Sequence, residues 1–285
     1  MRRLKRLVII IILPVLILSF GITSALSETP TEKIAQVNSY VGEELEYRIS
    51  FWLFEDVATG MVKLEKDENG EYMATLHAYT TGFVDRVLRH RVDTYVSHMA
   101  LSSDGKRFIT MRFEKTVETT GKTKKSLTVF DYSGGVMTWK TTETGKDDRT
   151  GEEKIPEGVY PVDPLAGFYN FRSGVYGPVN RGREYDIPTF PKDGRKRDIY
   201  LRINTKDEAQ QRINDRRFET EYLADVKIDK ELFGSRSGKV EIIFDADMIP
   251  SEAVAKDIFF FGDVRGKLVK TTFAMGSMKA APAGN

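Results

Sequence analysis

Cysteine is absent from the 285-residue chain, and histidine is scarce. Without thiols the chain can form no disulfide, thiolate metal site or cysteine nucleophile, and it cannot carry a lipid on an N-terminal cysteine. The three histidines are His77, His90 and His98, and no two of them have the close spacing of a His-Glu-x-x-His zinc site. We therefore expect structural histidines, and neither a metal nor any other cofactor.

A strong charge of either sign is also lacking, since 43 Lys and Arg residues oppose 42 Asp and Glu residues. Such a balance gives no support for a nucleic-acid partner. The phosphate-binding P-loop and the dinucleotide-binding glycine motif are missing too. The segment Gly234-Ser235-Arg236-Ser237-Gly238 differs in spacing from the nucleophile elbow of serine hydrolases and lies between predicted strands, so it indicates a hairpin tip.

The N-terminus carries the longest apolar run of the chain. A basic start from Arg2 to Arg6 precedes the apolar stretch from Leu7 to Phe20, and the small residues Thr23-Ser24-Ala25 follow. This pattern predicts a signal peptide over residues 1–25, cleaved after Ala25. The 20 residues from Leu7 to Leu26 are also long enough for an uncleaved membrane anchor. Both interpretations predict export across the inner membrane, to the periplasm or the cell envelope.

Alternation of polar and apolar residues, interrupted by turns, fills most of the remaining chain. Glu44 to Phe51 has the pattern of a strand with one buried face, and Asp67-Glu68-Asn69-Gly70 is typical of a hairpin turn. We expect further turns at Ala58-Thr59-Gly60 and Lys192-Asp193-Gly194, and a strand from Phe218 to Ile228. About twelve such strands predict an all-β, mainly antiparallel fold, either barrel-like or a strongly curved sheet.

One segment in the middle of the chain departs from the strand pattern. Asp163 is a good N-cap, and Pro164 suits the first turn of a helix. Leu165 and Phe168 then share one face of a short apolar helix, which we expect to lie against the sheet. A second short helix fits the spacing of apolar residues between Thr81 and Leu88. The expected organisation is a lead-in over residues 26–42, a β-rich domain over residues 43–273 with one or two short helices, and a flexible tail over residues 274–285.

Two short motifs in a fixed order resemble those of a known family. The first is an Asp-x-Leu-x-x-x-Tyr-x-x-Arg helix, and the second is an acidic turn before Ile-Pro with a glycine-containing closing strand after it. The matching residues are Asp163, Leu165, Tyr169, Arg172, Asp247, Ile249, Pro250 and Gly262. From about Glu43 to Thr272 the chain resembles the bacterial exported family called domain of unknown function 3108. The resemblance implies a β-rich periplasmic or envelope protein and carries no activity with it.

Two pairs of residues are candidates for binding. Arg172 is the cation at the end of the apolar helix, and Tyr169 lies about one turn earlier. They fit either an anionic head group at the mouth of a barrel or a structural role, because a cation is favourable at a helix C-terminus and can pair with a strand carboxylate. Asp245 and Asp247 fit a Ca²⁺ or glycan site, but a solvated turn with Asx hydrogen bonds before Ile249-Pro250 is the preferred interpretation.

Three functions are compatible with these residues. The first is a non-enzymatic envelope protein that binds an apolar or amphipathic ligand, such as a lipid or a lipid-linked glycan. A strand of ten residues is about 33 Å long, which suits an acyl chain. The second is a structural or assembly factor that binds another envelope protein, and the third is a glycan hydrolase that acts through carboxylates such as Asp245 and Asp247. The sequence favours the first and makes catalysis the less expected outcome.

Overall fold

Strands account for most of the computed structural model, which describes residues 36–190, 198–213, 216–230, 235–258 and 261–273. In chain order the strands are β1 (Glu44–Phe51), β2 (Phe54–Lys66), β3 (Tyr72–Thr80), β4 (Val92–Leu101), β5 (Phe108–Thr119), β6 (Lys122–Asp131), β7 (Val136–Glu143), β8 (Lys146–Lys154), β9 (Glu184–Ile187), β10 (Ile199–Ile203), β11 (Tyr222–Lys227), β12 (Lys239–Phe244), β13 (Pro250–Ile258) and β14 (Gly262–Thr272). The helices are α1 (Gly82–Val87), α2 (Pro164–Arg172) and α3 (Lys206–Ile213), with the 3-10 helices η1 (Val37–Tyr40) and η2 (Arg216–Glu219).

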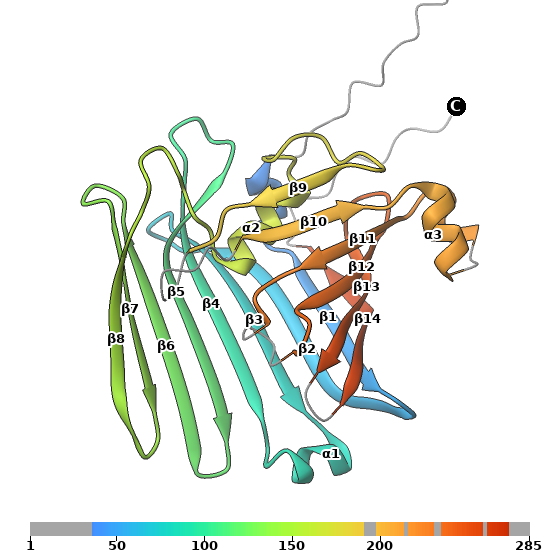
Figure 1. Ribbon diagram of the computed structural model, residues 1–285, viewed down its shortest axis with the longest axis horizontal. Helices are drawn as coiled ribbons and strands as arrows, with labels where there is room; N and C mark the ends of the chain where they lie inside the picture. The colour runs from blue at the N-terminus through green and yellow to red at the C-terminus, as the bar shows by residue number, and fades with distance from the viewer. Residues whose placement is uncertain (1–35, 191–197, 214–215, 231–234, 259–260, 274–285) are drawn as a thin grey trace, which may run out of the picture. The chain divides into compact units, whose positions relative to one another are not determined.

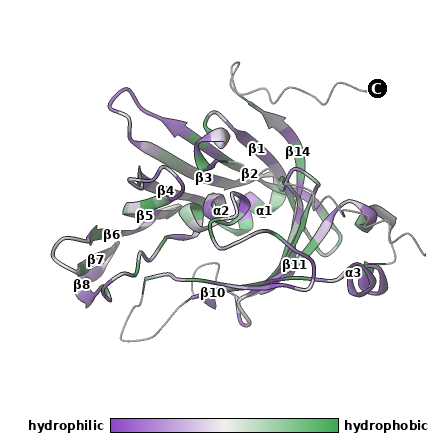
Figure 2. Cartoon of the chain, turned by 90° about the horizontal axis from the view of Figure 1, so that it is seen from above, coloured by the Kyte–Doolittle hydropathy of each residue, from purple (hydrophilic) through white to green (hydrophobic). Residues whose placement is uncertain are grey.

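The described strands form one 14-stranded sheet in the order β8-β7-β6-β5-β4-β3-β2-β1-β14-β13-β12-β11-β10-β9. All neighbouring strands pair antiparallel, and the pairing of β1 with β14 joins the first and last strands of the chain. The sheet bends, so that its two halves face each other (Figure 1). Figure 2 shows from above that α2 lies within the curve. The predicted all-β, antiparallel and strongly curved sheet is confirmed, and within the described residues β8 and β9 do not pair to close it.

The concave face of the sheet carries the main core. Directly paired residues share a face, and the register pairs Leu64 with Ala74 and Ala74 with Ser97, so these three side chains lie on the same side. α2 lies on that side and packs against β3, β4, β5 and η1. Its Tyr169 and Phe171 are buried in the same core. Burial of side chains of this size stabilises the fold by about 1.5–3 kcal/mol each.

The N-terminal end of α2 is fixed to the sheet by the carboxylate of Asp163. One oxygen caps the helix, accepting hydrogen bonds from the backbone N–H groups of Leu165 at 2.8 Å and Ala166 at 3.2 Å. The other oxygen accepts hydrogen bonds from the hydroxyl of Ser97 on β4 at 2.5 Å and that of Thr110 on β5 at 2.7 Å. The helix starts where the sequence predicts, and the same carboxylate attaches it to two strands.

The middle of α2 is attached by the amide of Asn170. Its Oδ1 accepts a hydrogen bond from the backbone N–H of Phe108, and its Nδ2 donates to the carbonyl of Phe108, both at 2.8 Å. The side chain therefore satisfies both backbone groups of a buried residue at the start of β5, as a neighbouring strand would.

The first hairpin reverses direction at a different place from the one expected. β2 runs unbroken from Phe54 to Lys66, so Ala58-Thr59-Gly60, which we expected to be a turn, lies within the strand. A Cβ at Gly60 would lie 3.4 Å from Ile49 Cδ1, at the lower limit of ordinary van der Waals contact. The chain turns instead at Trp52 and Leu53.

Helix α3 is not anticipated by the sequence pattern. It lies on the convex side of the sheet, where Ala209, Phe218, Leu223 and Ile243 form a second, small core. Phe218, which we expected to begin a strand, belongs to η2, and β11 begins at Tyr222. Hydrophobic periodicity is weak in α3 because only Ala209 of its eight residues is buried.

The expected lead-in over residues 26–42 ends in ordered structure, because Val37 and Tyr40 of η1 are buried in the main core. Other expected features lie outside the described residues, namely the signal peptide or anchor over residues 1–25, the turn at Lys192-Asp193-Gly194, the first residue of the tip at Gly234, and the tail from residue 274. No helix in the described ranges combines the length and the apolar character needed to cross a membrane.

The attachment of α2 through Asn170 gives a stability prediction. Asn170→Leu keeps the approximate volume but leaves both backbone groups of Phe108 unpaired, so we expect the free energy of unfolding to fall by about 2–4 kcal/mol. Denaturant unfolding followed by circular dichroism measures this change. The control is Asn180→Leu at an exposed position, which should shift stability by less than about 0.5 kcal/mol. Equal effects of the two substitutions would contradict the assignment.

Candidate functional site

Arg172, at the C-terminal end of α2, forms a buried ion pair with Glu43, just before β1. Both side chains are 0% exposed. Nη1 of Arg172 donates to Oε2 of Glu43 at 2.6 Å, and Nη2 donates to Oε1 at 2.7 Å. Nε donates to the carbonyl of Met248 at 2.7 Å. All three guanidinium nitrogens are therefore engaged, two of them in a bidentate charge-assisted pair.

Aromatic rings enclose the same guanidinium. The Cζ atom of Arg172 lies 4.2 Å from the ring centroid of Tyr40, 4.9 Å from that of Phe168 and 5.7 Å from that of Tyr169. The hydroxyl of Tyr40 donates to the backbone carbonyl of Arg172 at 3.2 Å. The hydroxyl of Tyr169 is buried and has no hydrogen-bond partner among the described residues. We refer to Tyr40, Glu43, Phe168, Tyr169, Arg172 and Met248 as the Arg172 cluster.

The turn before β13 is shaped to meet this cluster. Oδ1 of Asp245 accepts hydrogen bonds from the backbone N–H groups of Asp247 at 2.9 Å and Ile249 at 2.8 Å. The backbone of Met248, which lies between them, has a φ of 61°, a conformation that residues other than glycine rarely adopt. The turn thereby directs the carbonyl of Met248 toward Nε of Arg172. The acidic turn and the helix of the family motif, about 76 positions apart, thus meet in space.

The pKa values of Arg172, Tyr40 and Tyr169 in the cluster are all shifted upward. Burial alone lowers the pKa of Arg172, but the hydrogen bonds and negative charge of Glu43 outweigh it, so the net pKa is raised. Burial raises the pKa of the Tyr40 and Tyr169 hydroxyls. The arginine therefore stays cationic and the tyrosines stay neutral at physiological pH. None of these three groups has a pKa suited to acid–base catalysis near neutrality.

The two residues that the sequence offered as ligand contacts, Tyr169 and Arg172, are therefore both brought into the interior. An external anion could meet the Arg172 guanidinium only if Glu43 were displaced, so the geometry favours the structural one of the two roles left open. Sequence reasoning identified neither Glu43 nor Tyr40 as a partner. Glu43 is one of 42 acidic residues and lies 129 positions from Arg172, so no local pattern distinguishes it.

Asp245 and Asp247 form the hydrogen-bonded turn that the sequence preferred for them. The Oδ1 atom of Asp245 accepts two backbone hydrogen bonds and thereby fixes the conformation of that turn. No group of three or more His, Asp or Glu side chains in the described part of the chain is placed to hold a metal ion. The histidines have separate neighbours, with His77 near Thr94, His90 near Asp85 and His98 near Arg112.

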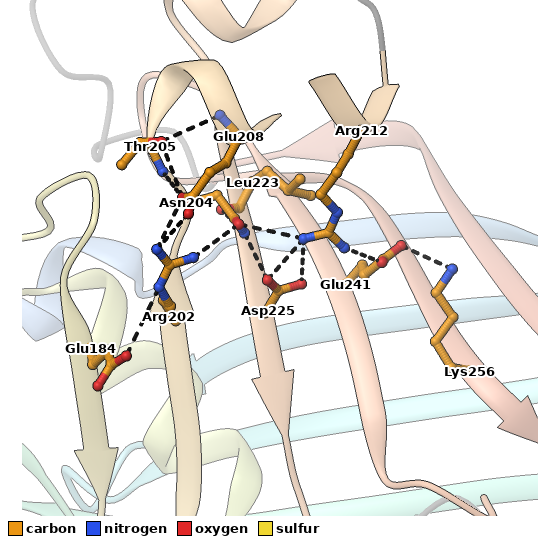
Figure 3. Close-up of polar contacts among 10 residues, drawn as sticks. All are labelled: Glu184, Arg202, Asn204, Thr205, Glu208, Arg212, Leu223, Asp225, Glu241 and Lys256. Atoms are coloured by element: carbon orange, nitrogen blue, oxygen red, sulfur yellow. Dashed lines mark hydrogen bonds and ion pairs between the residues drawn. The ribbon is translucent and has the colours of Figure 1, made fainter. Parts of the chain in front are cut away.

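A second polar cluster lies on the convex face, where side chains of α3 pair with residues of β10 to β12 and Lys256 of β13 joins through Glu241 (Figure 3). Arg202 pairs with Glu208 at 2.8 Å and 3.0 Å, and Arg212 pairs with Asp225 at 2.8 Å and also with Glu241. The hydrogen bonds from Arg202 and Thr205 lower the pKa of Glu208 to about 2. Each of these carboxylates pairs with a cation, so the cluster attaches α3 to the sheet and supplies no free carboxylate pair for glycan hydrolysis.

The concave face continues beyond the part that α2 covers, where apolar side chains lie beside a few charged ones, such as Asp93 and Lys115. Val62 and Leu76 are opposite each other on β2 and β3, and Val240 and Ile242 lie on the facing half of the sheet, on β12. All four pack against the main core but are only partly buried. An apolar surface on the inside of the curved sheet therefore remains partly accessible.

These features define a class of protein, an open, curved antiparallel sheet that holds a short helix in its concave face through a buried ion pair and buried hydrogen bonds. The chain belongs to the family described as Protein of unknown function (DUF3108), whose model matches residues 46–268. The match includes α2 and the acidic turn before β13.

Comparison with curated proteins found no match. Among solved structures, the chain is similar to a beta-barrel-like protein of domain of unknown function DUF1849 from Brucella abortus. The two are 13% identical, with a TM-score of 0.46, and the similarity covers 82% of this chain and 98% of the other.

The buried ion pair predicts a non-additive response to substitution. Arg172→Met or Glu43→Leu alone leaves an unpaired buried charge, so we expect each to reduce the free energy of unfolding by about 3–5 kcal/mol. The double variant removes both charges and should lose much less than the sum of the two. Urea unfolding of the four proteins gives the coupling energy. As a control, Arg48→Ala, which removes the exposed partner of Asp56, should cost less than about 1 kcal/mol. Additive effects at Arg172 and Glu43 would contradict the pairing.

Asp163 predicts a dependence of stability on pH. Burial raises its pKa above the ordinary value of 3.8, and the hydrogen bonds from Ser97, Thr110 and the helix backbone oppose this only in part. The folded chain then binds the Asp163 proton more tightly than the unfolded chain does. Proton binding therefore stabilises the folded state below pH 3.8, and this contribution to the free energy of unfolding is lost as the pH rises through the folded pKa.

We therefore expect the stability of the wild type relative to Asp163→Asn to decrease as the pH rises from about 3 to about 7. Unfolding curves of the two proteins across this range measure the difference. An increase with pH would show that the hydrogen bonds to the carboxylate outweigh its burial.

Proposed function

We propose that this protein is a non-enzymatic binding protein of the cell envelope, which takes an apolar or amphipathic ligand such as a lipid on the concave face of its sheet. The observation that carries the proposal is the partly accessible apolar surface beyond α2, formed in part by Val62, Leu76, Val240 and Ile242. An acyl chain laid along the strands would bury this surface, with a gain of about 25 cal/mol for each Å² removed from water.

The hydroxyl of Tyr169 supports the amphipathic character of the ligand. A buried hydroxyl without a hydrogen-bond partner costs about 1–3 kcal/mol, and that of Tyr169 has none among the described residues. A polar group of a bound molecule would satisfy it. Tyr169 is 0% exposed, so in this proposal neighbouring core side chains move aside to admit the polar group of the ligand to Tyr169, whereas Arg172 holds the helix in place through Glu43.

The polar clusters of the described chain have structural partners, which fits a binding role. Within the described chain, the tyrosines and the arginine of the Arg172 cluster are fixed in charge, and the carboxylates on the convex face pair with arginine. The proposed envelope location rests on the sequence of residues 1–25, which has the basic, apolar and small-residue segments of an export signal. Mass spectrometry of the intact protein from cell envelopes would show whether the chain begins after Ala25.

Two variants test the binding site with a fluorescent fatty acid, 11-(dansylamino)undecanoic acid, as the probe. Leu76→Gln places an amide on the inner surface, and we expect the affinity for the probe to fall about tenfold. Leu127→Gln is the matched control, because Leu127 is an exposed leucine on β6 at a distance from this surface. Equal affinities of the two variants would contradict binding on the concave face.

Tyr169→Phe separates ligand binding from folding. Removal of an unpaired hydroxyl should leave the free energy of unfolding unchanged or slightly higher, while affinity for the probe falls about fivefold to tenfold through loss of one hydrogen bond. The contrasting variant is Tyr132→Phe, since the hydroxyl of Tyr132 donates to the carbonyls of Thr110 and Pro161. That variant should lose stability and keep its affinity. A loss of stability in Tyr169→Phe without weaker binding would remove Tyr169 from the site.

A further inference from the structure

Four large apolar side chains in the described chain are more than half exposed, and all lie at one end of the sheet. They are Trp52 at 87% and Leu53 at 96% in the turn between β1 and β2, and Phe83 at 58% and Val87 at 61% in α1. Phe54, 41% exposed, lies between the two groups, with its ring centroid 5.3 Å from that of Phe83. These five residues form what we call the apolar tip. The turn and α1 lie at the same end of the sheet (Figure 1).

The base of the apolar tip is firmly held, so its exposure is a property of the fold. The ring of Phe51 packs at 5.6 Å from that of Phe54 and at 4.9 Å from that of Phe261 on the neighbouring turn. The hydroxyl of Thr81 donates to the carbonyl of Asp56 at 2.7 Å, which joins the start of α1 to β2. Trp52 has φ of 53°, an unfavourable conformation for a bulky residue. The turn thus holds the side chains of Trp52 and Leu53 in water at a cost in folding free energy.

Charged groups surround the apolar tip without covering it. Arg86, on α1 between Phe83 and Val87, is exposed, and so is Arg89 just beyond the helix. Residues 83, 86 and 87 fall on one side of a helix, so the cation and the two apolar residues face the same way. The nearby Asp56 is neutralised by Arg48 at 2.7 Å. Two more acids lie nearby, Glu55, which is exposed beside Phe54, and Asp85 on α1, which accepts a hydrogen bond from the Thr80 hydroxyl at 2.6 Å. The apolar tip therefore protrudes with charges of both signs at its border, as a side-chain group that enters the interface of a bilayer would.

We propose that the apolar tip inserts into the surface of a lipid bilayer. Tryptophan and phenylalanine are favoured at the boundary between head groups and acyl chains, where Trp52 and Phe83 would lie, while Arg86 meets lipid phosphates. The two most exposed side chains project from the apex of a turn instead of lining a hollow. A fluid bilayer accepts such a projection, whereas a protein partner would need a preformed pocket of matching shape. This inference does not depend on the ligand proposed for the concave face.

The chain has two tryptophans, Trp52 and Trp139, which allows a direct test with the full chain. In Trp139→Phe, Trp52 is the only tryptophan and can be excited selectively over the tyrosines. The protein is mixed with vesicles of phosphatidylethanolamine and phosphatidylglycerol that carry bromine on their acyl chains. We expect the emission of Trp52 to shift to shorter wavelength and to be quenched. In the companion variant Trp52→Phe, Trp139 on β7 should not be quenched. Because the readout reports on one side chain, attachment of the N-terminus to the membrane cannot produce it.

Two further variants in the Trp139→Phe background show which surface is responsible. Leu53→Glu with Phe83→Glu should lower the quenching of Trp52 at least about fivefold, whereas Leu127→Glu with Val129→Glu, exposed on β6, should leave it unchanged. Thermal melts confirm that each variant is folded. Unquenched Trp52 in a folded protein would overturn the proposal. A cross-link from position 53 to another protein, with Trp52 unquenched, would overturn it in favour of a protein partner.

Discussion

The bidentate ion pair between Arg172 and Glu43 joins parts of the chain that are far apart in sequence. Arg172 ends the helix inside the curve, Glu43 precedes the first strand, and the carbonyl of Met248 belongs to the turn before β13. Taking two charges out of water costs several kcal/mol for each ion, and the pair offsets that cost only when its geometry and hydrogen bonds are complete. The sheet and the helix are therefore held in one relative position.

The need to satisfy buried polar groups also bears on how this large sheet keeps its shape while it stays open. In the described residues β8 and β9 do not pair, so curvature alone does not complete a barrel. Polar contacts inside the curve take over part of that role, because Asp163 attaches α2 to β4 and β5 and Asn170 attaches it to the start of β5. Each contact satisfies buried groups that would otherwise be costly, so the helix has one favourable position.

Two surfaces remain for interaction once this core is formed. The concave face beyond α2 carries partly accessible apolar side chains, and the apolar tip projects from one end of the sheet. We propose an acyl chain as the ligand of the first and the surface of a bilayer as the partner of the second. Together they are the properties that a protein would need to exchange an amphipathic molecule with a membrane, although each stands on separate residues and separate contacts.

The sequence by itself determined the elements whose cause is local. Alternation of apolar residues predicted the antiparallel sheet, and Asp163 with Pro164 predicted the start of α2, because strand faces and helix caps depend on residues within a few positions. Only the tertiary structure decided which acid meets Arg172, that Gly60 lies within a strand, and that Trp52 and Leu53 form the exposed turn. Those outcomes depend on strand register and on contacts between residues over 100 positions apart, which no local pattern records.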